Sequence, residues 1–152
     1  MEHNNRNENI AYTADCAMSF YEQLEDVCTA DFTIREKYAI LRDIFKRVVN
    51  QGIAHNSINF IGMFAKLDYL TKQHGIPTET AMLIHDTRKE LNAMHSMSNE
   101  ELEQALAYNI KSTALLVSYV CGVTAIPQSL NRLLLWSFCT PRLEVGRRSK
   151  PH

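Results

Sequence analysis

The sequence predicts an all-α protein, an antiparallel bundle of four to five main helices followed by a short C-terminal helix. Apolar residues recur at intervals of three and four along the chain, whereas no useful stretch alternates with a period of two. Glycine or proline separates several of the periodic segments, at Gly52, at Gly75 and Pro77, and at Gly122 and Pro127. A chain of 152 residues, 45% of them hydrophobic and 22% charged, has the composition of one globular domain.

Each periodic segment predicts one helix. The six helices are expected at about 14–27, 34–49, between 57 and 74, 78–95, from 98 to about 121, and 128–138. The segment Ser98 to Glu101 matches an S-x-x-E capping box, so the longest helix is expected to begin there. Gly75 and Pro77 end the third helix, whose expected core stripe consists of Phe60, Met63, Phe64, Leu67 and Leu70.

Composition divides the chain into three parts. Residues 13–139 are expected to form the helical bundle domain. Residues 1–12 are polar and rich in asparagine, so we expect a disordered lead-in. Residues 140–152 contain four basic residues and one acidic residue, which predicts a flexible basic tail.

Several function classes are disfavoured by the sequence. A net charge of -1 argues against a protein that coats nucleic acid through bulk electrostatics. The four cysteines form no C-x-x-C pair and have no histidine at ligand spacing, so no metal site or other cofactor is predicted. With only five glycines, a nucleotide-cradling loop is not expected.

The first residues lack an apolar signal region and no apolar run reaches membrane-spanning length, so we expect a cytoplasmic protein without a membrane partner.

The second helix is the most basic segment of the chain. Its positive charges could form a surface that faces phosphates, or they could be an ordinary solvated face diluted by Glu36 and Asp43. On the first hypothesis, the candidate RNA-binding residues are Arg42, Lys46, Arg47 and, in the fourth helix, Lys89.

The fourth helix combines a polar ridge with an apolar seam. His85, Arg88, Asn92 and His95 are separated by three or four residues, so they share one ridge of the helix. The seam beside this ridge consists of Ile84, Thr87, Leu91 and Met94. The helix is therefore expected to pack through its seam and to present a basic, hydrogen-bonding edge.

The stretch from Leu83 to His95, with Arg88, Asn92 and His95 at its end, resembles the HEPN family (higher eukaryotes and prokaryotes nucleotide-binding). The resemblance covers roughly residues 34–121 in pattern and implies a helical bundle, commonly dimeric, that either cleaves RNA without a metal or binds RNA or proteins without catalysis. Carried over, His95 would transfer protons, Arg88 would stabilise phosphoryl charge, and Asn92 would orient the site. Lys89 follows Arg88 directly, and six residues separate Arg88 from His95, which departs from the usual pattern of the family.

Three functional hypotheses follow. The first is a HEPN-like module for RNA contact or protein interaction without catalysis. The second is a metal-independent endoribonuclease of toxin or defence type that uses Arg88 and His95 in one open cleft. The third is an N-terminal accessory module of a larger nucleic-acid NTPase. The apolar last helix further predicts a homodimer or partner-protein contact through Leu130, Leu134, Trp136 and Phe138.

Overall fold

A computed structural model describes the backbone of residues 2–54 and 56–139 and the side chains of residues 15–54 and 56–135. Its elements are α1 (Glu2–Thr29), α2 (Ile34–Gly52), α3 (Gly62–Gln73), α4 (Thr78–Ala93), the short 3-10 helix η1 (Met94–Ser96), α5 (Asn99–Cys121) and α6 (Gln128–Cys139). The described residues form helices and no strand, which confirms the predicted all-α helical bundle.

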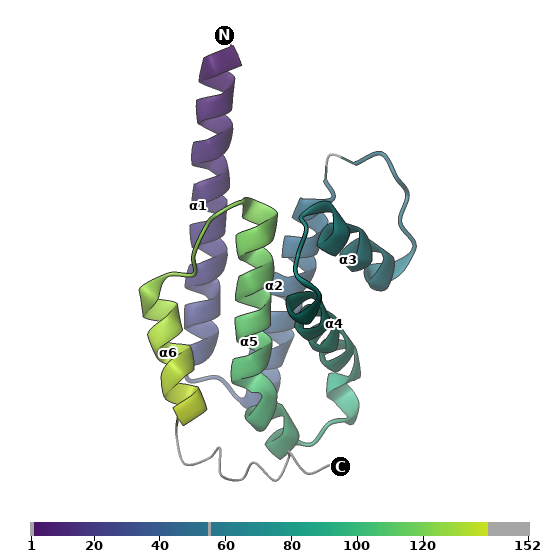
Figure 1. Ribbon diagram of the computed structural model, residues 1–152. Coiled ribbons are helices and arrows are strands. Elements are labelled where there is room, and N and C mark those ends of the chain that lie inside the picture. Colours follow the sequence, from purple (N-terminus) through teal and green to yellow (C-terminus); the bar gives the residue numbers. More distant parts are fainter. Residues whose placement is uncertain (1, 55, 140–152) are drawn as a thin grey trace.

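The helices pack around α5, which contacts α1, α2, α4 and α6. Figure 1 shows α1 and α6 running in one direction beside α5, which runs in the other, so these neighbours are antiparallel. The α3–α4 pair lies on the side of α2 and α5 away from α6 and returns the chain to the starting end of α5. This return places α4 against both α3 and α5.

The first helix begins earlier than predicted. It starts at Glu2 rather than near Ala14, so residues 2–12, which we expected to be a disordered lead-in, belong to α1. This segment contains neither glycine nor proline, so no backbone breaker separates it from the amphipathic part of the helix. Figure 1 shows this N-terminal part of α1 extending past the neighbouring helices.

The predicted start of α5 is confirmed at the level of its cap. The Ser98 hydroxyl accepts a hydrogen bond from the Glu101 backbone N–H at 3.1 Å, and the Glu101 carboxylate accepts one from the Ser98 N–H at 2.9 Å. Thr33 and Glu36 form a second capping box at the start of α2. Both boxes satisfy backbone donors that would otherwise have no partner within the helix.

The third helix begins later than its apolar pattern suggested. Gly62 adopts a φ of 87°, a left-handed conformation that glycine adopts without a steric penalty, and the helix starts at this residue. Phe60 therefore precedes α3. Leu67 and Leu70 are buried as expected, but Phe64 is 56% exposed, so its assignment to the core stripe was wrong.

The last helix packs within its own chain. Leu130 and Leu134 are buried in the core that α6 shares with α1 and α5, so these two residues are not exposed for the partner contact that we expected. The apolar character of Leu130 and Leu134 is therefore explained by burial within the bundle and does not require a partner. The side chains of Trp136 and Phe138, and the whole of the predicted tail 140–152, lie outside the described residues.

A buried polar layer fixes α4 against α5 and α2. The Asn109 side chain, 3% exposed, donates to the Tyr38 hydroxyl at 3.1 Å and to the Glu90 carboxylate at 2.9 Å, and its oxygen accepts from the Thr87 hydroxyl at 2.8 Å. The Thr87 hydroxyl also contacts that of Ser112. Buried polar groups that are fully hydrogen-bonded favour one relative placement of the helices.

Arg35 joins α2 to the connection between α4 and α5. Its guanidinium donates to the carbonyl oxygens of Met94 and Met97, at 3.1 and 2.5 Å, and to the side-chain oxygen of Asn99 at 2.8 Å. These bonds hold η1 against the start of α2. No helix within the described part of the chain is long and apolar enough to cross a membrane.

Candidate functional site: a basic cleft between α2 and α4

The apolar seam of α4 determines which of its side chains reach the surface. All four predicted seam residues are buried: Ile84, Thr87, Leu91 and Met94. Since the ridge lies beside the seam, burial of the seam leaves Arg88 and Asn92 on the surface that α4 presents to α2 and α3. The predicted packing of the helix through its seam is confirmed, and Arg88 and Asn92 lie beside that seam in the lining of a cleft.

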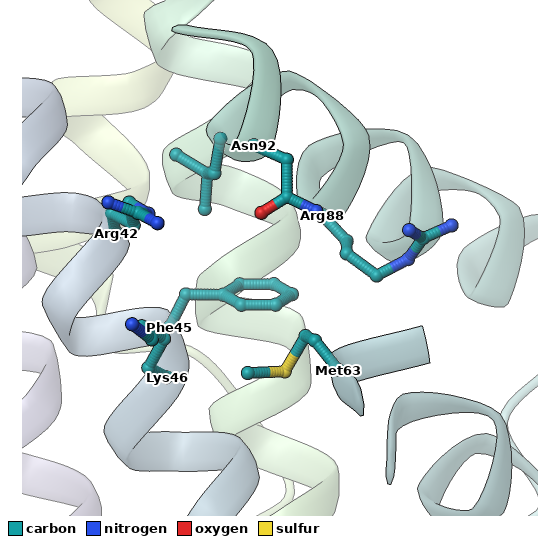
Figure 2. A pocket seen from close by; sticks show the side chains of 7 residues that line it. Arg42, Phe45, Lys46, Met63, Arg88 and Asn92 are labelled. Carbon is teal, nitrogen blue, oxygen red and sulfur yellow. The ribbon is translucent and has the colours of Figure 1, made fainter. Parts of the chain in front are cut away.

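Arg88 and Asn92 line a cleft of about 350 Å³ between α2, α3 and α4. Its lining consists of Arg42, Phe45 and Lys46 from α2, Met63 from α3, and Arg88, Leu91 and Asn92 from α4. Figure 2 shows Arg42 and Lys46 on one wall, Asn92 and Arg88 on the other, and the ring of Phe45 between them. The cleft therefore has an apolar floor and a polar, cationic rim.

The rim carries three positive charges that no acidic side chain neutralises within the described residues. Arg42, Lys46 and Arg88 take part in neither of the ion pairs found there, which are Arg47–Asp43 and Lys72–Asp68. No carboxylate lines the cleft. Uncompensated cations beside an amide and an apolar floor favour an anion that carries a planar or apolar part, such as a nucleotide unit.

A second cluster holds the Arg88 side chain at the outer edge of the cleft. Its Nε donates to Nδ1 of His85 at 3.3 Å, and its guanidinium carbon lies 5.1 Å from the centre of the Phe64 ring. The rings of Phe64 and His85 are 5.2 Å apart and inclined by 41°. Figure 2 shows the Arg88 guanidinium pointing away from Arg42.

The surroundings of the histidine in this cluster favour its neutral form. Burial, and next the positive charge of Arg88, lower the pKa of His85 from its usual value near 6.5. Asp68 and Asp86 oppose this shift, while Lys89 adds to it. A neutral imidazole leaves Nδ1 as an acceptor, which is the form that the Arg88 hydrogen bond requires.

The three residues of the proposed catalytic motif are not gathered at one place. Arg88 and Asn92 line the cleft, whereas His95 is an exposed residue of η1, beyond the end of α4, and is not part of the lining. The histidine that contacts Arg88 is His85, one turn before it. The α-helical ridge that was expected to include His95 ends at Ala93.

Only two of the four predicted RNA-binding residues lie in the cleft lining. Arg42 and Lys46, four residues apart on α2, both line the cleft. Arg47 instead pairs with Asp43 at 2.8 Å, donates to Gln23 of α1 at 2.6 Å and lies over the Phe20 ring. Lys89 is exposed and is not part of the lining. A helical wheel distinguishes Arg42 and Lys46 from Arg47, because adjacent residues differ by about 100° around the helix.

Sequence reasoning missed the apolar and aromatic components of the site. Met63 and Leu91 line the cleft although they were assigned to apolar stripes, and Phe64 was assigned with Met63. The available signal was the spacing of Met63, Leu67 and Leu70, which forms a complete stripe and leaves Phe64 at its border.

The opposite side of α4 carries the opposite charge. A hollow of about 340 Å³ lies between α4 and α5 and is lined by Leu83, Asp86, Thr87, Glu90, Ala105, Tyr108 and Asn109. Two carboxylates in this lining disfavour phosphate there. The described residues contain no group of three or more His, Cys, Asp or Glu side chains that could hold a metal ion.

Comparison of the chain with protein-family models, with curated proteins and with solved structures found no match.

Proposed function

We propose that this protein is a HEPN-like helical-bundle module that binds RNA through the cleft between α2 and α4 and does not cleave it. The observation that carries the proposal is that Arg42, Lys46, Arg88 and Asn92 all line one cleft with an apolar floor. Three of these residues are cations without an acidic partner within the described side chains. The resemblance of the stretch around Arg88 to HEPN motifs points to the same class of ligand.

The phosphodiester backbone of RNA suits this rim. Arginine binds phosphate through two parallel hydrogen bonds, lysine acts as a point charge, and the asparagine amide can bond a ribose hydroxyl or a base edge. Because the net charge of the chain is -1, attraction must come from this local group of cations rather than from the whole surface.

Binding without cleavage is favoured by the position of His95. A general acid or base must lie within hydrogen-bond reach of the proton that it moves. His95 is not part of the cleft lining, and Arg88 is bonded to His85 instead. The cleft residues therefore supply charge and hydrogen bonds to an RNA without a proton-transferring partner among them.

The test is fluorescence anisotropy with a labelled single-stranded RNA of mixed sequence. The double variant Arg42→Ala/Lys46→Ala should weaken binding at low salt, and its affinity should depend less on salt, by about 0.7 in the log–log slope for each phosphate that is no longer bound. Arg47→Ala is the matched control, because it removes one positive charge from the same helix on the face toward α1. Its effect should be small.

Equal loss of affinity in Arg47→Ala and in the double variant would indicate non-specific attraction to a basic helix and would contradict the proposal. Absence of RNA binding by the unmodified protein at low salt would contradict it as well. Circular dichroism of the unmodified protein and of both variants shows whether each is folded, so that a folding defect is not mistaken for weaker binding.

A further inference from the structure

We infer that Phe64 and Arg88 form a base-stacking platform at the edge of the cleft, so that the bound ligand is a single strand with an unpaired base beside a held phosphate. The inference rests on the proposed function and specifies its ligand. Phe64 directly follows Met63 of the cleft lining and contacts Arg88, which lines the cleft itself. Phosphate-binding and aromatic groups are thus contiguous.

The Phe64 ring has surface left for a ligand. Its two described ring neighbours, His85 and Arg88, are three residues apart on α4, so both approach from that helix. Phe64 nevertheless remains 56% exposed. An aromatic side chain held in place by its neighbours yet open to solvent loses little conformational freedom when a base stacks on it.

Arg88 adds a second planar group, which lies over the Phe64 ring. Its guanidinium carbon is 5.1 Å from the ring centre, and its hydrogen bond to His85 restrains it there. Bases stack on guanidinium planes as well as on aromatic rings. Arg88 can therefore bond a phosphate through its outward N–H groups while it forms part of the stacking surface, which joins the two halves of one nucleotide site.

A platform of this kind selects single strands. In a duplex the faces of each base are covered by its neighbours, so a side chain cannot reach them unless the base leaves the stack, and unstacking costs free energy. In a single strand the base faces are available, and stacking tolerates any base because each has a π-face. The affinity should consequently fall for a duplex that presents the same number of phosphates.

The experiment measures affinities for a short single-stranded RNA, for the same strand with abasic positions, and for its duplex. Phe64→Leu should weaken binding of the intact strand by about 5-fold to 100-fold, as expected when one base no longer stacks on an aromatic ring. Phe64→Trp should retain binding. Ile61→Ser is the matched control, since Ile61 is a 90% exposed apolar residue three positions earlier. It should bind like the unmodified protein.

The abasic strand separates stacking from charge. It keeps its phosphates, so its affinity should already be low for the unmodified protein and should change little with Phe64→Leu. Supporting outcomes are a selective loss of affinity in Phe64→Leu, retention in Phe64→Trp, and weaker binding of the abasic strand and the duplex. Because Phe64 is exposed, the leucine variant is expected to fold, and circular dichroism checks this.

Failure of this inference is distinct from failure of the proposed function. If Phe64→Leu and the abasic strand bind unchanged while Arg42→Ala/Lys46→Ala loses affinity, the stacking platform is refuted and the phosphate cleft stands. If neither set of changes alters binding, both are refuted. A duplex that binds as tightly as the single strand also overturns the inference.

Discussion

The side chain of Asn109 in α5 donates a hydrogen bond to the Glu90 carboxylate of α4 across 2.9 Å. Glu90 precedes the buried residue Leu91 and lies two residues from both Arg88 and Asn92, so this contact helps to set the rotation of α4 about its axis. The rotation decides which residues of α4 face the cleft. A buried amide at the centre of the bundle is therefore linked to the placement of a partly buried arginine at the cleft.

Removal of the Asn109 amide should destabilise the fold. Asn109→Ala deletes hydrogen bonds to Tyr38, Thr87 and Glu90 at a site that is almost fully buried, so we expect the free energy of unfolding to fall by about 2–4 kcal/mol. Urea denaturation measures this. The control Asn92→Ala, at an exposed position of α4, should change stability by no more than about 0.5 kcal/mol. Equal stability of the two variants would show that the polar layer is not stabilising.

Arg35 should stabilise the connection between α4 and α5. Arg35→Met removes its bonds to Met94, Met97 and Asn99 and leaves the two carbonyls without this donor, for an expected decrease in stability of about 1–3 kcal/mol. Arg35→Lys keeps the charge but lacks the planar fork that reaches three acceptors, so it should recover little of that stability. Full recovery with lysine in thermal or urea unfolding would mean that charge, not geometry, is what matters.

Stability should decrease in mild acid because of His85. Since burial and Arg88 lower its pKa in the folded state, the unfolded chain binds the proton more readily. The contribution is fully present above the unfolded value near 6.5 and is lost as the pH falls from there toward the folded pKa. Burial also lowers the pKa of His74, so this residue acts in the same direction.

Urea midpoints at pH 7.5 and pH 5.5 test this dependence. His85→Gln should reduce the difference between the two pH values, and His74→Gln should reduce it independently. An unchanged difference in His85→Gln would show that protonation of this imidazole is not linked to folding.

His95 should be dispensable. RNA incubated with the protein in EDTA should remain intact, and His95→Ala should bind RNA with unchanged affinity, because His95 does not line the cleft. Gel analysis of a mixed RNA substrate tests whether the RNA stays intact, and fluorescence anisotropy measures the affinity of His95→Ala. Metal-independent cleavage that drops by about 10²-fold to 10⁴-fold in His95→Ala would instead establish the ribonuclease hypothesis.

Much of the fold could be predicted because it depends on local signals. Helix α5 begins where the Ser98–Glu101 capping box predicts it, since the cap is made within four residues of sequence. The seam from Ile84 to Met94 is buried because its period matches that of a helix. The start of α1 was missed because residues 2–12 are polar, and polarity alone does not exclude a helix that continues from an amphipathic one.

The sequence by itself determined the helices, their apolar faces and the presence of cations on α2 and α4. Only the tertiary structure decided that Arg42 and Lys46 line one cleft with Asn92 while Arg47 turns to Gln23, and that His85 rather than His95 contacts Arg88. The physical reason is that periodicity fixes positions around a single helix, whereas the neighbour of each face follows from packing between segments far apart in the chain. The exposure of Phe64 depends on that packing in the same way.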